Sequence, residues 1–293
     1  MNEPSYRAVI RGLLRAIMSN APPVVSQWMY KQLQGTIRRL GTPTIRPIAR
    51  IRGGGRMHTS LDDLPQSLVY YMGVYEWDVT QCMSKRLPVD GVFVDIGANA
   101  GFFTIWSALR AGSGGHVYSF EPQPEMYALL RENVLLNLLE NVSTFSTALG
   151  DSIGTVRLAL SAGDTGLAHI VIDETADVEQ TSVPIETLES CLGPLPRLDM
   201  MKIDVEGAEL RVLKGAASYL SGDNPPILFV EVVDRHLQRL GDSEAALLEF
   251  LRGFGYQPYS VSTGGDLVEY ISSGRHVKTQ AFIPGRRTTR RCH

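Results

Sequence analysis

The sequence predicts an α/β protein in which a mostly parallel β-sheet is covered by helices on both faces. Two observations carry this prediction. From residue 91 onward, short apolar runs typical of strands alternate with stretches of helical periodicity. The runs "VFVDI" (92–96) and "PILFVEV" (226–232) are almost continuously apolar, as expected for strands that are buried on both faces. Repeated strand–helix units favour parallel pairing, because each helix returns the chain to the same edge of the sheet.

Each expected element follows from its local pattern. Residues 5–19 and 24–40 place apolar side chains at helical spacing, and "APP" at 21–23 separates the two helices. A further helical stretch over 64–87 should break near Gly73. The remaining strands are expected at 116–121, 142–149, 198–204, at three insertion pieces (155–160, 168–172, 181–186) and at 257–265, 266–274 and 278–284. The remaining helices are expected within 97–112 and over 124–139, 208–220 and 243–255.

Composition indicates one large globular domain with a modest extension. The chain has 293 residues, of which 44% are hydrophobic and 20% are charged. No apolar run approaches the roughly 18 residues of a membrane-spanning helix, and Arg11 and Arg15 interrupt the N-terminal apolar stretch. The three cysteines are odd in number and widely spaced, so they predict neither a disulfide framework nor a metal site. A reducing, cytoplasmic location fits best.

Charge is distributed unevenly along the chain. Residues 1–56 carry ten Lys and Arg against one acid, a net of +9, and residues 275–293 carry six Lys and Arg and no acid. The intervening segment is strongly acidic. The basic ends could fold back on this acidic body, or they could contact an anionic partner such as a membrane surface. We expect a basic helical extension (1–56), a catalytic body (57–284) and a basic tail (285–293). A homo-oligomer formed through the extension is also compatible with this pattern.

The strongest local motif is "VFVDIGANAGFFT". A strand ends at Asp95, and Gly97 and Gly101 then flank a short loop that opens a helix. Glycine tolerates positive φ and lets a ligand approach the backbone. In open α/β sheets, ligands bind at the carboxyl ends of the strands. The motif therefore predicts a ligand site at this turn.

A second motif indicates an adenosine. Glu121 ends the next strand, 24 positions after Gly97, where a carboxylate can accept hydrogen bonds from both ribose hydroxyls. Nicotinamide cofactors use the same device, but their glycine fingerprint is absent, since Asn99 and Phe102 stand where the second and third glycines belong. Both side chains would crowd a pyrophosphate. A ribose acceptor without a pyrophosphate cradle favours S-adenosylmethionine.

The stretches "DIGANAGFFT", "FEPQPEMYALLRENV" and "LDMMKIDVEGAELRVLKGA" together resemble the FkbM family of class I S-adenosylmethionine-dependent methyltransferases. "GVYEWDVTQ" and "TQAFIP" resemble the borders of that family, so the resemblance covers roughly residues 57–284. It implies a Rossmann-like fold with a seven-stranded sheet in the order 3-2-1-4-5-7-6. It also implies O-methyl transfer, usually to a sugar, a glycan or a secondary metabolite, although the acceptor of this chain does not carry over.

Motif positions assign expected roles to individual residues. Asp95, Gly97, Asn99 and Gly101 should hold the methionine part of the cofactor and its ammonium. Glu121 should hold the ribose, and Asp204 should face the sulfonium. The full set of expected cofactor-binding residues is Asp95, Gly97, Asn99, Gly101, Glu121, Pro122, Thr147, Ala148 and Asp204.

A hydroxyl acceptor also needs a base or a metal to take its proton. The candidate catalytic residues are Asp204, Glu206, Glu231 and His236, although a solvated helix position is the more common situation for a histidine such as His236. Lys202 lies on the same face as Asp204 and should pair with it. Glu209 should serve the first turn of its helix. The carboxylates could instead hold Mg²⁺, but we do not favour this and predict no metal site.

Two other functions remain open at this stage. A non-catalytic or cofactor-sensing module would keep the fold without turnover. A nucleic-acid methyltransferase could use the basic ends, but amine methylation of nucleobases typically uses Asn/Asp-Pro-Pro-aromatic after the fourth strand, where this chain reads "DVEG". The acidic body argues against this function as well, so no nucleic-acid partner is favoured.

Overall fold

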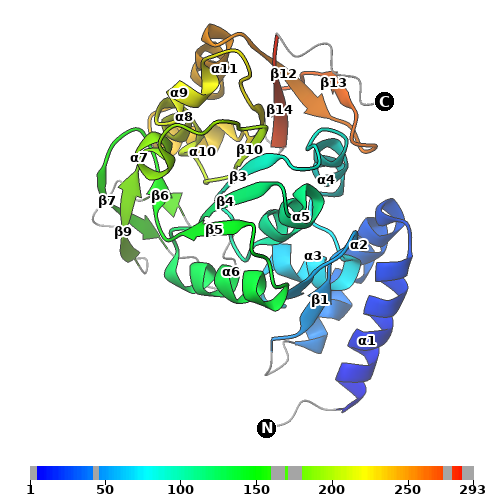
Figure 1. The fold of residues 1–293 in the computed structure, drawn as a ribbon. Coiled ribbons are helices and arrows are strands. Elements are labelled where there is room, and N and C mark those ends of the chain that lie inside the picture. The colour runs from blue at the N-terminus through cyan, green and yellow to red at the C-terminus, as the bar shows by residue number, and fades with distance from the viewer. Residues whose placement is uncertain (1–4, 42–45, 160–168, 171–179, 273–278, 286–293) are drawn as a thin grey trace.

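The computed structural model describes residues 5–41, 46–159, 169–170, 180–272 and 279–285. A central sheet of eight strands runs through the molecule (Figure 1). Its strands are β3 (Val92–Ile96), β4 (His116–Phe120), β5 (Val142–Phe145), β10 (Met200–Ile203), β11 (Ile227–Glu231), β12 (Tyr256–Val261), β13 (Leu267–Glu269) and β14 (Thr279–Pro284).

The strand order confirms the expected topology. The sheet reads β13-β12-β14-β11-β10-β3-β4-β5, which is the order 3-2-1-4-5-7-6 with one strand added beyond the sixth. The five strands from β11 to β5 pair in parallel, and β14 pairs antiparallel to both of its neighbours. The expectation of seven strands was therefore one too few. The chain turns at Gly264-Gly265, and β13 then pairs with β12, with Tyr259 opposite Glu269.

Helices cover both faces of this sheet. Side chains alternate along a strand, so Phe93 of β3 packs in one apolar cluster and Val94 in another. The Phe93 cluster joins the sheet to α3, α4, α5 and α6, and the Val94 cluster joins it to α7 through α11. The bounds are α3 (Leu64–Met72), α4 (Trp77–Ser84), α5 (Phe102–Ala111), α6 (Pro124–Leu136), α7 (Leu188–Leu192), α8 (Glu209–Lys214), α9 (Ala217–Leu220), α10 (Asp234–Arg239) and α11 (Glu244–Gly253).

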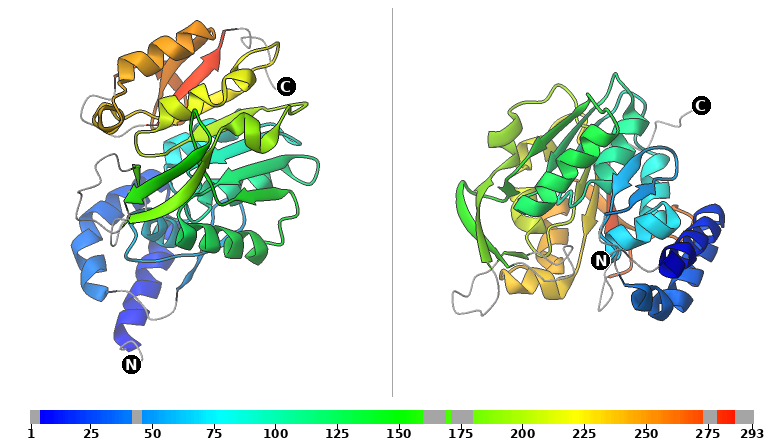
Figure 2. Two further views of the ribbon diagram at one scale, coloured as in Figure 1. Left: turned by 90° about the vertical axis from the view of Figure 1, so that its left-hand side faces the viewer. Right: turned by 90° about the horizontal axis from the view of Figure 1, so that it is seen from below.

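The insertion forms a second, four-stranded sheet on the flank of the first (Figure 2). Its strands, in the order β6-β9-β7-β8, are β6 (Ala148–Leu149), β7 (Gly154–Ala159), β8 (His169–Ile170) and β9 (Gln180–Glu186). The single strand expected over 142–149 is thus two strands in two different sheets. The helix expected over 208–220 is likewise divided into α8 and α9 at Gly215, where a Cβ would lie 1.8 Å from the carbonyl oxygen of Gly150.

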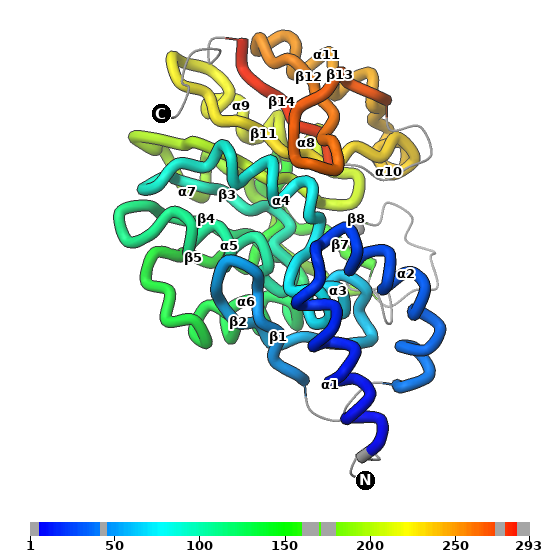
Figure 3. The backbone as a smooth tube through the Cα atoms, turned by 90° about the vertical axis from the view of Figure 1, so that its right-hand side faces the viewer, coloured from blue at the N-terminus to red at the C-terminus, as the bar shows by residue number. Residues whose placement is uncertain are grey.

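The N-terminal segment folds against the body. Helices α1 (Ser5–Asn20) and α2 (Pro23–Leu40) lie beside α3 (Figure 3). Met18 and Tyr30 are buried in the same cluster as Phe93 of the central sheet. Strands β1 (Ile48–Arg50) and β2 (Arg56–His58) pair across the expected boundary at residue 56. The extension and the start of the body therefore share a core, and the domain bounds remain predictions.

Within the described part of the chain, none of the helices combines the length and the apolar character that a membrane crossing would require. The cytoplasmic location inferred from the cysteine pattern remains a prediction. The basic tail lies outside the described residues, apart from Gly285.

Candidate active site

A cavity lies at the carboxyl ends of β3, β4, β10 and β11, where a parallel sheet of this type places its ligands. It is lined by the loop after β3, by the start of α5, by residues of α3 and by the second sheet. Nine of the twelve predicted site residues line it, namely Gly97, Asn99, Glu121, Pro122, Thr147, Ala148, Asp204, Glu206 and Glu231. The other three are Asp95, Gly101 and His236.

The loop after β3 is held in an unusual backbone conformation. Gly97 has φ of 81°, and a Cβ at this position would lie 1.8 Å from the carbonyl oxygen of Asp204. Asn99 has φ of 49°, and its Oδ1 accepts a hydrogen bond from the Ala100 amide at 2.6 Å. Glycine at position 97 is therefore required by the close approach of the loop to the chain after β10. This approach brings the loop and Asp204 to one place.

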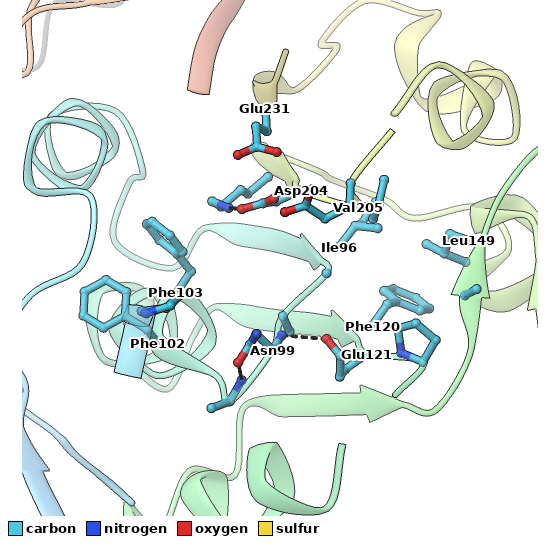
Figure 4. A pocket seen from close by; sticks show the side chains of 18 of the residues that line it. Ile96, Asn99, Phe102, Phe103, Phe120, Glu121, Leu149, Asp204, Val205 and Glu231 are labelled. Atoms are coloured by element: carbon cyan, nitrogen blue, oxygen red, sulfur yellow. Dashed lines mark hydrogen bonds and ion pairs between the residues drawn. The ribbon is translucent and has the colours of Figure 1, made fainter. Parts of the chain in front are cut away.

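Glu121 is anchored to the same loop. Its Oε2 accepts a hydrogen bond from the Asn99 amide at 2.7 Å (Figure 4). Its Oε1 accepts one from the Gln123 amide at 2.9 Å. Burial raises the pKa of Glu121 to about 7, although these two amides lower it and the nearby Asp95 and Asp204 raise it. Each carboxylate oxygen can accept a second hydrogen bond, so the side chain is able to receive two ligand hydroxyls.

Asp95 has a different environment from the one expected. Its side chain is 1% exposed and is not among the described residues that line the cavity. Its Oδ2 accepts a hydrogen bond from Thr104 Oγ1 at 2.7 Å, and that hydroxyl also contacts Ser119 Oγ at 2.8 Å. Burial raises the pKa of Asp95 to about 6, although Lys202 and Thr104 lower it. Asp95 thus ties β3 to α5, and a direct contact with a cofactor ammonium has no support from its position.

Gly101 also has a packing role. It precedes α5 with φ of 95°, and a Cβ there would lie 2.6 Å from Cδ1 of Leu130 in α6. Glycine at this position lets α6 pack close to the start of α5. The side of the loop that meets the cavity consists of Gly97 to Ala100.

The predicted pair of Lys202 and Asp204 is confirmed. Lys202 Nζ donates a hydrogen bond to Asp204 Oδ2 at 2.7 Å and lies 4.6 Å from the centre of the Phe103 ring. Burial lowers the pKa of Lys202, but the carboxylates of Asp204, Glu76 and Asp95 raise it by more. The net effect is a pKa above the ordinary value, so the amine stays charged. Asp204 still faces the cavity, with 20% of its side chain exposed.

Glu206, Glu231 and His236 gather at the rim of the cavity. His236 Nδ1 lies 2.9 Å from Glu206 Oε2. Glu231 is 7% exposed, and burial followed by the charges of Asp204 and Glu206 raises its pKa well above the ordinary value. The expectation of a solvated His236 was wrong, since its side chain is 5% exposed. Gly207 passes close to α10 here, with a Cβ position 2.4 Å from the His236 carbonyl oxygen.

Glu209 has the structural role predicted for it. It is the first residue of α8, and its Oε1 accepts hydrogen bonds from the amides of Gly207 at 3.0 Å and Val205 at 3.3 Å. These bonds hold the turn that presents Glu206 to the cavity.

Two parts of the site escaped the sequence analysis. Glu76 precedes α4 with φ of 40°, accepts a hydrogen bond from Thr279 Oγ1 at 3.0 Å, and places Oε2 4.0 Å from Lys202 Nζ. Tyr75 and Gln66 line the cavity from the segment before the sheet. The only sequence signal was "GVYEWDVTQ", which resembled a family border without indicating a role.

The strand order and the cavity at the strand ends define a Rossmann-like fold of the class I methyltransferase type. The sequence profile described as "Methyltransferase FkbM domain" matches residues 95–258. The chain therefore belongs to the FkbM methyltransferase family.

Individual relatives share about 30% sequence identity with the chain. The chain is 31% identical to "Methyltransferase sdnD" of Sordaria araneosa, over 44% of this chain and 62% of that protein. It is 30% identical to "Hexuronic acid methyltransferase AglP" of Haloferax volcanii, over 51% of this chain and 59% of that protein. The chain thus spans about three fifths of the length of these relatives. The crystal structure of methyltransferase FkbM from Methylobacillus flagellatus KT superposes with a TM-score of 0.43 at 18% identity, over 66% of this chain and 44% of that one.

Proposed function

We propose that the protein is an S-adenosylmethionine-dependent methyltransferase that acts on a hydroxyl of a sugar, a glycan or a secondary metabolite. One observation carries the proposal. A single cavity is lined on one side by the glycine loop and Glu121 and on the other by Asp204 and Glu231 (Figure 4). The first side suits an adenosine, and the second suits a cationic sulfonium and an acceptor proton. The printed name of the Haloferax relative, a hexuronic acid methyltransferase, is in keeping with a sugar acceptor.

The residues present fit this cofactor. When bound, S-adenosylmethionine supplies a methyl group on a sulfonium, which is already activated for transfer. Glu121 would accept the ribose hydroxyls, and Thr147 and Ala148, which line the cavity from the second sheet's side, would face the adenine. Pro122 would pack beside it. Asp204, turned to the cavity and balanced by Lys202, would stabilise the positive charge of the sulfonium.

The acceptor hydroxyl must lose its proton as its oxygen takes the methyl group. Asp204, Glu206 and Glu231 are the carboxylates that line the cavity at the ends of β10 and β11. His236 lies behind Glu206 and is not among the described lining residues, so we propose that it positions that carboxylate. Holding the hydroxyl in line with the methyl group would supply much of the acceleration, on the order of 7–11 kcal/mol at best.

Titration calorimetry with S-adenosylmethionine tests this function. We expect the wild-type protein to bind the cofactor and Glu121→Ala to bind it roughly 100-fold more weakly, because two hydrogen bonds to a charged group are lost. Glu125→Ala is the matched control, since Glu125 is exposed on α6 and is not among the described residues that line the cavity. A wild-type protein that does not bind the cofactor would contradict the proposal.

Radiolabelled methyl transfer to components of a cell extract then separates an enzyme from a cofactor-sensing module. The enzyme predicts a labelled product that depends on the protein and is lost in Glu121→Ala. The sensing module predicts cofactor binding without any labelled product.

We also propose that the N-terminal helices rest on an anionic membrane surface. Tyr6, Val9, Leu13 and Ile17 lie at helical spacing on one side of α1, and each is more than half exposed. Trp28 of α2 is also exposed. The surrounding segment carries a net charge of +9. Arg11 of α1 is buried, whereas Lys31, Arg38 and Arg39 of α2 are exposed. An exposed apolar stripe in a basic segment is typical of helices that lie in the interface of an acidic bilayer.

Vesicle co-sedimentation checks this proposal. We expect binding to vesicles that contain phosphatidylglycerol, little binding to pure phosphatidylcholine, and release by salt. Leu13→Asp should abolish the binding, whereas Leu135→Asp, which is similarly exposed on α6, should leave it intact. A concentration-dependent dimer without vesicle binding would show that a second copy covers the stripe instead.

A further inference from the structure

We infer that Glu206, Glu231 and His236 bind a divalent cation at the rim of the cavity. One ligand atom from each side chain lies within 4.8 Å of the others. Two of the residues line the cavity, and the third is held against Glu206, with Nδ1 and Oε2 2.9 Å apart. Glu231 ends β11, Glu206 lies in the turn after the neighbouring strand β10, and His236 lies on α10.

An independent observation points to a missing ligand. Glu231 is 7% exposed, and its Oε2 is buried without a hydrogen-bond partner among the residues that the structure describes. A buried carboxylate without a partner is costly, because it has lost its water shell. Lys202, the buried cation of this region, already donates to Asp204. A cation between Glu231 and its two neighbours would supply the missing partner of this oxygen.

A hydrogen bond from a neutral His236 to Glu206 is the competing explanation for the cluster. Arg235 Nε donates to His236 Nε2 at 3.2 Å, which places the ring proton on Nδ1, facing Glu206. Cation binding through Nδ1 requires that proton to move to Nε2 and the Arg235 side chain to turn away. Arg235 is exposed, so it is free to do so. The two explanations therefore differ in one measurable property, the affinity for a metal ion.

The donor set indicates which cations would bind. One imidazole nitrogen and two carboxylates suit Mn²⁺, Co²⁺ or Zn²⁺ better than Mg²⁺, which prefers oxygen ligands and retains its waters. Because the cluster borders the cavity, further coordination positions would be open to water or to an acceptor hydroxyl. This proposal departs from our sequence-based expectation of no metal site.

The catalytic use of this cation rests on the proposed function, whereas its binding does not. A hydroxyl bound at the cluster would have a lowered pKa. Its O–H bond would break with the proton passing to the Asp204 carboxylate. The new O–C bond would form as the S–C bond breaks, and that electron pair would remain on sulfur. Glu231 would then be a ligand, and Asp204 would be the remaining carboxylate able to take the proton.

Binding of Mn²⁺ to chelator-treated protein, without cofactor, tests the site. Electron paramagnetic resonance and calorimetry should report one Mn²⁺ per chain. Glu231→Gln and His236→Gln should each weaken binding by at least about tenfold, since even the loss of a residue that supports a ligand costs that much. Glu76→Gln is the control, because it removes a carboxylate near Lys202 that lies outside the cluster. It should change the affinity only a few-fold.

Each result has a definite meaning. Thermal unfolding must show that the variants are folded, and Mn²⁺ should raise the melting temperature of the wild-type protein but not of Glu231→Gln. A wild-type protein that binds neither Mn²⁺ nor Zn²⁺ below millimolar concentration overturns the inference, as does unchanged binding in both cluster variants. Methyl transfer at full rate in EDTA would exclude the catalytic use of the cation and keep the proposed function. Mn²⁺ binding without any methyl transfer would keep the site and remove that function.

Discussion

Replacing Gly97 by alanine is expected to cause a large loss of folding stability. The residue has φ of 81°, which costs an L-residue about 1–2 kcal/mol. The added Cβ would also lie 1.8 Å from the Asp204 carbonyl oxygen, which is a backbone atom that no rotamer change can move. We expect a total loss of at least about 4 kcal/mol, against a folding stability of about 5–15 kcal/mol for a typical domain.

Gly112→Ala is the matched control for this substitution. Gly112 has φ of 72°, yet nothing lies within 4 Å of its Cβ position. With ψ of −174°, the control carries a backbone cost of about 1–3 kcal/mol without the collision, and it should lose only that amount. Urea unfolding followed by circular dichroism measures both changes. Equal losses in the two variants would show that the loop is able to move away from β10 at little cost.

Glu121→Gln is expected to become more stable relative to the wild-type protein as the pH rises from 5 to 8. Burial raises the pKa of Glu121 from 4.5 to about 7. The protonated form therefore stabilises the folded state most fully below pH 4.5, and this contribution is lost as the pH rises through 7. This rise in the pKa corresponds to at most about 3 kcal/mol of folding stability. The amide variant does not titrate, so it lacks this pH dependence.

The same substitution also has a constant cost. The carboxylate accepts hydrogen bonds from the amides of Asn99 and Gln123 with its two oxygens, and the amide has only one oxygen. One backbone amide is left without its partner, at a cost of about 1–3 kcal/mol at every pH. We therefore expect the variant to be the less stable protein at pH 5 and to recover much of the difference at pH 8. Cofactor affinity should fall at both pH values.

Melting temperatures across this pH range measure the effect. Glu125→Gln, an exposed carboxylate on the neighbouring helix, should follow the wild-type curve throughout. A constant difference between Glu121→Gln and wild type would show that Glu121 keeps one protonation state over the range.

Local pattern was sufficient to locate most elements and the first half of the site. Apolar runs predicted the strands β3, β4, β10 and β11, and helical spacing predicted the helices between them. These patterns are local, because the buried positions of one strand or one helix face lie within a short stretch of sequence. The glycine loop and Glu121 were also found from local pattern, because each directly follows a strand that the sequence marks clearly. The strand order was predicted from the resemblance to a family. That order does not include the additional edge strand β13.

The sequence by itself determined which residues stand at the carboxyl ends of the strands, and hence that Glu121, Asp204 and Glu231 would face one edge of the sheet. Only the tertiary structure decided what each of them meets there. Asp95 accepts a hydrogen bond from Thr104 of α5, and His236 lies against Glu206. Glu76, which is far from Lys202 in the sequence, lies near its amine. These partners are separated by many residues, and side-chain pairing across elements depends on how helices pack on the sheet, which no local pattern specifies.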